Sequence, residues 1–312
     1  MRRLAYQAAA VAVALIVVGY LVHNASVNLA ERRIASGFGF LEREAGFEIS
    51  ESPFLRYSAS DTYLSALAVG VGNTLRVAFI GIVAATLLGA AVGLFRLSKN
   101  FLLRTLAAAY VEFIRNSPLL VQLFFWYAVI TEALPMPREA LQPLPGVFLT
   151  NRGIYFPAPG SVPVLESFNF AGGFVLTPEF TALLLGLTVY TAAFIAEIVR
   201  GGIQAISHGQ TEAAHALGLS GTQTTRLVIL PQALRVIIPP LTNQYLNLTK
   251  NSSLAVAIGY PDLVQIFAGT ALNQSAKAIE IMLMTMAVYL SLSLITSVVM
   301  NIYNRRMAFV ER

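Results

Sequence analysis

Cysteine is absent from this chain of 312 residues, and charged residues make up only 12% of it. Without cysteine the chain has no disulfide bond, no zinc ribbon and no thiol nucleophile. A soluble domain carries roughly 25% charged residues, so this chain has too little polar surface for a body surrounded by water. The mean hydropathy of +0.67 points the same way. We therefore expect the chain to lie in a lipid bilayer.

Lysine and histidine are also scarce. The lysines are Lys99, Lys250 and Lys277, and none follows a glycine, so the chain has no P-loop for ATP. His208 and His215 have no cluster of carboxylates or thiols beside them, and we interpret them as solvated rather than metal-binding. The net charge of +5 is spread beside apolar runs, which argues against nucleic-acid binding. No nucleophile stands beside a base, so we expect neither a catalytic residue nor a cofactor in this chain.

Apolar runs dominate what is present. A bilayer core about 30 Å thick needs about 20 apolar helical residues. Runs near that length predict an all-α integral membrane protein with about six transmembrane helices, at 4–22, 77–94, 119–134, 180–199, 236–258 and 279–303. Three glycines in the second run, Gly81, Gly89 and Gly93, predict close packing against another helix.

Basic residues near the ends of these runs predict the orientation. Arg2 and Arg3 precede the first run, which is longer than the apolar part of a signal peptide and is interpreted as an uncleaved span. The positive-inside rule then places both termini in the cytoplasm. Residues 23–70 and 135–176 fall outside the membrane. The second of these segments is rich in proline and glycine, so it forms no long helix; an ordered loop or lid and a mere spacer both remain open.

The segment 97–115 has apolar residues at helical spacing together with several charges. This pattern predicts a helix lying at the cytoplasmic interface. The sequence Asn116-Ser117-Pro118 then predicts the start of a new helix, with Asn116 or Ser117 as its cap and Pro118 in its first turn. The chain is expected to bend there into the third span.

The loop between the fourth and fifth runs predicts two short helices. Ser207 with Gln210, and Ser220 with Gln223, each have the spacing of a capping box. Gly218 stands where the first helix ends, in the left-handed conformation that glycine tolerates. Such a protruding hairpin is either a docking element or an ordinary connector.

This loop resembles a known motif. Seven residues match the EAA loop of the permeases of ABC importers, with Val228 where the family commonly has Ile: Glu212, Ala213, Ala214, Gly218, Val228, Leu230 and Pro231. The resemblance implies a type I ABC importer transmembrane domain with cytoplasmic coupling helices. It also implies that the loop fits a groove on a separate ATPase subunit, which binds ATP and Mg²⁺.

Further stretches resemble the polar amino-acid branch of these permeases. They lie at 73–76, 110–120 and 250–254, and the similarity covers residues 67–303, which form the permease domain with 135–176 as an external insert. Residues 1–66 are then an N-terminal helix with an external segment, and 304–312 a cytoplasmic tail. Stretches at 38–41, 45–47 and 151–153 further resemble the first permease of general L-amino-acid importers, the AapQ/BztB type.

The resemblance implies a multi-pass permease subunit that carries polar L-amino acids across the bacterial inner membrane. Its implied partners are two copies of a cytoplasmic ATPase, a second, non-identical permease, an external amino-acid-binding protein and membrane lipid. The alternative function is an ion-coupled secondary transporter or channel, against which stands the absence of a recognisable inverted repeat.

Polar residues at 249–253 interrupt the fifth run. Such residues are tolerated at membrane depth only against protein or a watery cavity, so they predict a substrate path. Its candidate residues are Asn247, Lys250, Asn251 and Ser252. Lys250 either attracts a substrate carboxylate or forms a structural pair with Glu197 or Glu132. Arg76 is expected near a span end, reaching toward the interface.

Overall fold

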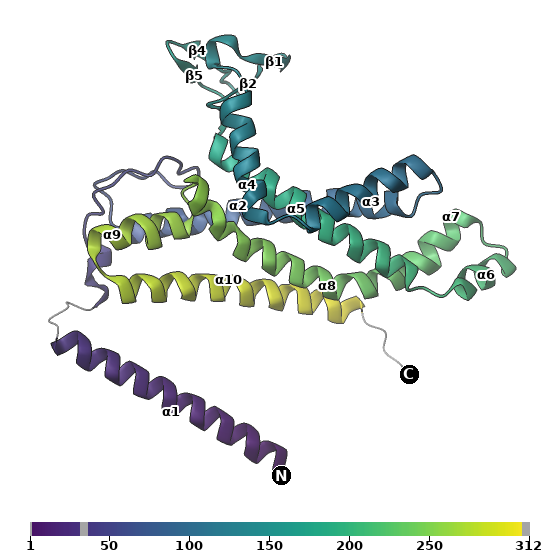
Figure 1. The fold of residues 1–312 in the computed structure, drawn as a ribbon, viewed down its shortest axis with the longest axis horizontal. Helices are drawn as coiled ribbons and strands as arrows, with labels where there is room; N and C mark the ends of the chain where they lie inside the picture. The colour runs from purple at the N-terminus through teal and green to yellow at the C-terminus, as the bar shows by residue number, and fades with distance from the viewer. Residues whose placement is uncertain (1, 32–36, 308–312) are drawn as a thin grey trace.

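The computed structural model describes residues 2–31 and 37–307, and most of them are helical (Figure 1). The helices are α1 (Arg2–Glu31), η1 (Phe38–Glu42), α2 (Tyr63–Arg96), α3 (Phe101–Arg115), α4 (Leu119–Ala128), η2 (Val129–Ala133), η3 (Pro137–Glu139), α5 (Pro178–Gln204), α6 (His208–Ala216), α7 (Gly221–Gln223), η4 (Thr224–Ile229), α8 (Leu230–Asn251), η5 (Ser252–Ile258), η6 (Val264–Ala271), α9 (Leu272–Ser275) and α10 (Ala278–Met307). The strands are β1 (Leu141–Leu144), β2 (Val147–Thr150), β3 (Gly153–Phe156), β4 (Val164–Glu166), β5 (Asn169–Ala171) and β6 (Phe174–Leu176).

The helices α2 and α5 share the most extensive contact in the bundle. A Cβ placed on Gly89 would lie 2.6 Å from the Cβ of Ile195, and one on Gly93 would lie 2.8 Å from the carbonyl oxygen of Ala196. Real side chains never approach so closely, so only glycine lets these two backbones meet. The close packing predicted from the glycines of the second run is confirmed.

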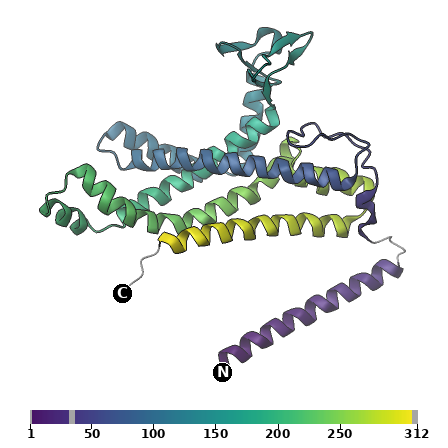
Figure 2. The same ribbon diagram turned by 180° about the vertical axis from the view of Figure 1, so that it is seen from behind.

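Two apolar cores hold the bundle together. The larger one lies between α2, α4, α5 and α8, and Leu123, Leu183 and Leu187 are fully buried in it. The second joins the N-terminal half of α2 to η6 and α10, and it also takes in Phe40 from η1. Residues before α2 are thereby fixed to the end of the bundle, while α1 lies apart from the other helices in both views (Figure 2).

The expected count of six spans is not confirmed. Among the described residues, α2, α5 and α10 are long and apolar enough to cross a membrane, and α3 with the α4–η2 segment adds a fourth span if the bent pair counts as one. The run at 236–258 is divided between α8 and the 3₁₀-helix η5, and its many polar residues keep it below the hydropathy of a span. The run at 4–22 lies within α1, where a shorter apolar helix covers Tyr6–Leu21.

The bend between α3 and α4 is confirmed, with an angle of 106°. The predicted cap is wrong in detail. Pro118 itself is the cap residue of α4, and Asn116 ends α3 instead. The Ser117 hydroxyl bonds back to the carbonyl of Phe113 and accepts from the Gln122 amide at 2.8 Å, so it is not free to cap. Asn100 caps α3, which therefore begins at Phe101 rather than at 97.

The segment between η2 and α5 is ordered. We call residues 135–176 the external module, after the external position that the sequence predicts for them. The strands β1, β2, β3 and β6 form one antiparallel sheet in that order, and β4 pairs with β5 in a second. As the proline content predicted, the described residues here contain no long helix. The module sits at the far end of α4, away from α8 and α10 (Figures 1 and 2).

Candidate functional site

The hairpin between α5 and α8 projects beyond the ends of both helices (Figure 1). Gly218 adopts φ +78°, the left-handed conformation expected for the elbow after α6. Its N–H bonds the carbonyl of His215 and the next N–H bonds that of Ala214, which satisfies the last carbonyls of α6. Ser220 and Gln223 form the predicted capping box in full.

Two details of the predicted hairpin are wrong. Ser207 caps α6 by accepting from the N–H of Gly209, and Gln210 accepts from the amide of Gln232 instead of closing a box. The second helix is not separate, because α7 continues through η4 into α8. Pro231 has no N–H for the carbonyl of Leu227, and the helix just before it widens into a π-helix.

The motif residues on α6 differ in how far they are exposed to solvent. Ala214 is buried and lies where α6 packs on η4, while Glu212 and Ala213 are exposed on the outer side of α6. Two leucines of the hairpin that are not part of the motif are also exposed, Leu217 at 82% and Leu227 at 61%. The hairpin therefore presents an apolar surface beside a carboxylate, which is the composition of a surface that packs against protein. The His208 ring lies 3.0 Å from Glu212, and His215 lies 3.1 Å from the carbonyl of Leu219.

A polar stripe runs along α8. Asn243, Asn247 and Lys250 are exposed and recur at helical spacing, and Pro239 and Pro240 continue the same side. The opposite side of α8 carries Ile237, Leu241 and Leu248, which are buried in the larger core. Of the predicted path residues, Asn247 and Lys250 lie in this stripe, Asn251 is half-buried and Ser252 is fully buried, with its hydroxyl bonded to the carbonyl of Thr249.

The predicted structural pairing of Lys250 is wrong. Glu197 forms ion pairs with Arg96 of α2 and Arg200 of its own helix, so its carboxylate is already matched. Within the part of the chain that the structure describes, Lys250 has no ion pair with Glu132 or any other carboxylate. Lys250 is therefore an exposed ammonium between asparagines, and its place in a substrate path stays a prediction.

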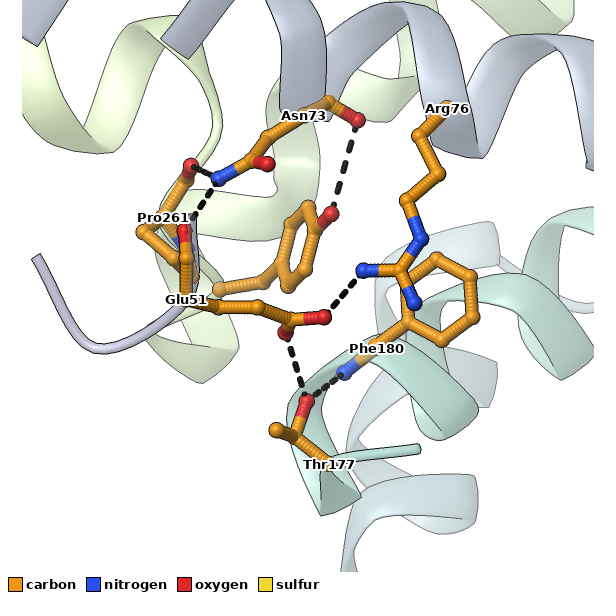
Figure 3. Close-up of polar contacts among 7 residues, drawn as sticks. Glu51, Asn73, Arg76, Thr177, Phe180 and Pro261 are labelled. Atoms are coloured by element: carbon orange, nitrogen blue, oxygen red, sulfur yellow. Dashed lines mark hydrogen bonds and ion pairs between the residues drawn. The ribbon is translucent and has the colours of Figure 1, made fainter. Parts of the chain in front are cut away.

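A polar cluster that the sequence analysis did not predict lies at the end of the bundle opposite the hairpin of α6 and α7 (Figure 3). Arg76 does not reach toward an interface; its guanidinium pairs with the carboxylate of Glu51. The second carboxylate oxygen of Glu51 accepts from the hydroxyl of Thr177, the residue that caps α5. Asn73 donates to the carbonyls of Glu51 and Pro261, both at 2.8 Å. We call Glu51, Asn73, Arg76 and Thr177 the external clasp, after the side of the membrane that the sequence predicts for residues 23–70.

The external clasp joins four segments of the chain. It ties the segment before α2 to α2, to the start of α5 and to the residues after η5. No local pattern marks such a cluster, and the only signal in the sequence was that Arg76 and Glu51 are charged residues close to apolar runs. Elsewhere in the segment before α2, burial and the carboxylates of Asp61 and Glu48 raise the pKa of Tyr57 to about 12.

Comparison with known proteins adds three findings. Residues 78–309 match the family described as the binding-protein-dependent transport system inner membrane component. The chain is 46% identical to the putative amino-acid ABC transporter permease protein YhdX of Escherichia coli K12, over 98% of this chain and 94% of that protein. It is 44% identical to the general L-amino acid transport system permease protein AapQ of Rhizobium johnstonii, over 100% of this chain and 93% of that protein.

The fold also matches a solved structure. A crystal structure of an amino acid ABC transporter with histidines superposes with a TM-score of 0.60, at 27% identity, over 78% of this chain and 95% of that chain. The alignment with YhdX runs over 371 positions, more than this chain has residues, so that relative contains residues that have no counterpart here.

Proposed function

This chain belongs to the family of binding-protein-dependent transport system inner membrane components, and from that premise we propose that it forms half of the translocation path of an importer for polar L-amino acids. It is the membrane-spanning permease subunit of an amino-acid ABC transporter, a class whose members work with an ATPase and a binding protein. The sequence relatives favour this function over an ion-coupled carrier or a channel.

The observation that carries the coupling part of the proposal is the exposed hairpin of α6 and α7. It leaves the bundle at the end of α5 (Figure 1), and Glu212, Leu217 and Leu227 are exposed on it. We propose that it inserts into a groove on the cytoplasmic ATPase, two copies of which bind ATP and Mg²⁺ for the whole complex. The chain itself then does no covalent chemistry.

The translocation path is proposed to run along the polar stripe of α8. Amide and ammonium groups facing lipid would be costly, so the stripe faces either protein or water. A second, homologous permease laid against this face would enclose a path with polar walls on both sides. Asn247 and Lys250 would then meet the substrate, while Asn251 and Ser252 support the turn from α8 into η5.

Reconstitution of the purified complex tests this function. The complex in proteoliposomes should take up radiolabelled polar L-amino acids only when ATP and the external binding protein are both supplied. Uptake that follows an imposed proton or sodium gradient without ATP would contradict the proposal. Purification of the tagged chain with its partners tests the assembly, since a heteromeric complex should contain a second permease and two ATPase copies.

A further inference from the structure

Three charged side chains meet at a hollow in the external module. A cavity of about 320 Å³ is lined by Arg138, Glu139, Asn151, Arg152 and Phe168, among others. Cavities that hold small molecules begin at about this size. Within the part of the chain that the structure describes, neither the two guanidinium groups nor the carboxylate of Glu139 has an ion pair. Charges of both signs therefore remain available around one small cavity.

Two turns of the module form opposite parts of the hollow. Pro137 is buried at the start of η3, the turn that carries Arg138 and Glu139. The N–H of Asn151 bonds the carbonyl of Pro135 at 2.9 Å, which ties the turn after β2 to the segment before η3. The relative position of the two turns is therefore set by a bond within the module.

The two arginines are positioned by different contacts. The Arg138 guanidinium donates to the carbonyl of Ser167 at 3.3 Å, and its carbon lies 5.3 Å from the centre of the Phe168 ring. The turn between β4 and β5 thereby forms a third wall. The N–H of Arg152 bonds the hydroxyl of the buried Thr150 at 3.1 Å, which fixes the turn after β2.

Asn151 adds an unsatisfied acceptor to the hollow. Its Oδ1 is buried and has no hydrogen-bond partner in the structure. A buried carbonyl without a donor costs free energy that a bound donor would recover. An ammonium group supplies three such donors, and the carboxylate of Glu139, which lines the same cavity, neutralises its charge.

The charges of the hollow select the class of ligand. Two guanidinium groups and one carboxylate give it a net charge of +1. Arginine binds a carboxylate with two parallel hydrogen bonds, so the hollow has places for two carboxylates and one ammonium. An α-amino acid with a carboxylate side chain carries these three groups and the opposite net charge. The Phe168 ring lies beside them to cover the short apolar stem of such a ligand.

We propose that this hollow is a binding site for an acidic α-amino acid, separate from the polar stripe of α8. Each carboxylate of the ligand pairs with one of the two arginines, and its ammonium lies between Glu139 and the Oδ1 of Asn151. The module lies away from α8, so the site is occupied independently of the proposed path (Figures 1 and 2). This assignment rests on the proposed function only for the presence of amino acids at this chain.

Equilibrium binding of radiolabelled L-glutamate tests the site. The intact complex is placed in nanodiscs of phosphatidylcholine, which has no primary ammonium to compete, without ATP or binding protein. We expect Glu139→Gln and Arg152→Gln each to weaken binding at one site per chain about tenfold or more, as loss of a hydrogen bond to a charged group does. Glu166→Gln and Arg56→Gln are matched controls, because both residues are exposed and neither lines the hollow. Binding that all four variants leave unchanged would overturn the proposal.

Ligand analogues test which group each residue binds. N-acetyl-L-glutamate has no ammonium, and L-glutamine has no side-chain carboxylate. We expect each of them to compete for the wild-type site about tenfold less well than L-glutamate. Glu139→Gln should remove the disadvantage of the N-acetyl analogue and leave that of L-glutamine. Equal competition by all three ligands on the wild type would show that the charges of the hollow do not select the ligand.

This site and the proposed function can fail separately. If the reconstituted complex takes up amino acids with ATP and a binding protein, but the hollow variants bind L-glutamate as the wild type does, only the site is wrong. If the wild type binds L-glutamate in the hollow but shows no ATP-dependent uptake, the proposed function is wrong and the site stands.

Discussion

The guanidinium carbon of Arg76 lies 3.9 Å from the centre of the Phe180 ring, while the same group pairs with Glu51. The side chains of Arg76 and Glu51 are only 14% and 11% exposed, so the pair is largely withdrawn from solvent. Phe180 stands in the first turn of α5, and its N–H bonds the Thr177 cap. The contact therefore closes the external clasp against the start of α5.

Breaking this pair should destabilise the outer end of the bundle. Arg76→Met leaves the Glu51 carboxylate without its cation, and we expect the free energy of unfolding to fall by about 3 kcal/mol. Thermal unfolding of the purified protein measures the change. Arg56→Met, which removes an exposed arginine from the same segment, is the control and should change little. The double variant Glu51→Gln, Arg76→Met should be more stable than Arg76→Met alone; equal melting of Arg76→Met and Arg56→Met would show that the pair contributes nothing.

The elbow of the hairpin should depend on backbone conformation. Gly218→Val places a branched side chain at φ +78°, which costs about 1–2 kcal/mol, whereas Gly218→Asn is tolerated there. We expect Gly218→Val to lose transport while still inserting into the membrane, and Gly218→Asn to keep most of it. Gly221→Val is the matched control, because Gly221 is also unobstructed but has an ordinary φ. Equal transport by all three variants would show that the conformation of Gly218 has no role in coupling.

Close packing of α2 on α5 predicts a steric effect. Gly89→Ala would place its Cβ 2.6 Å from the Cβ of Ile195, so the two helices must separate, at a cost of about 1–3 kcal/mol. Gly201→Ala meets nothing within 4 Å in the same helix pair and should be neutral or stabilising. Thermal unfolding of both variants checks this. A Gly89→Ala protein that melts with the wild type would mean that the backbones are not in contact.

Substitution of Lys250 should change substrate uptake rather than the stability of the protein. Lys250→Met removes the charge but keeps the length, and we expect the KM for uptake to rise about tenfold, as for loss of a hydrogen bond to a charged group. Lys99→Met, at an exposed lysine before α3, should transport normally. Unchanged uptake of every amino acid tested, with normal amounts of protein, would place Lys250 outside the path.

The orientation is testable with reporter fusions. A reporter inserted after Asn151 should be external, and one after Gln210 should be cytoplasmic. The two sites lie on opposite sides of α5, so reporters on the same side would show that α5 does not cross the membrane.

Hydropathy and local motifs predicted much of the scaffold. The apolar runs at 77–94, 180–199 and 279–303 correspond to α2, α5 and α10, because long uncharged runs have few alternatives to a helix. Gly218 and the Ser220 cap were predictable because their effects stay within a few residues. The glycines of α2 were also informative, since small residues at helical spacing indicate a backbone contact.

Long-range pairing was not predictable in the same way. Glu197 had two candidate partners near it in space, Arg96 and Arg200, yet only Arg200 is near in sequence. The assignment of Lys250 to Glu197 failed because a helical spacing gives no information about which helix lies opposite. The strands of the external module were missed because segments of three or four residues between prolines and glycines carry too weak a periodic signal.

The glycine contacts between α2 and α5 restrict how this subunit can move. Two backbones that touch at Gly89 and Gly93 cannot slide past each other without collision, so we expect α2 and α5 to move as one rigid body through a transport cycle. The helix α8 is packed on the same pair, because a Cβ on Gly202 of α5 would lie 2.3 Å from the Ile237 side chain, and the hydroxyls of Thr86 and Tyr245 meet at 2.9 Å. We therefore expect α8 to move with α2 and α5, so that the polar stripe is carried through the cycle as part of one solid wall.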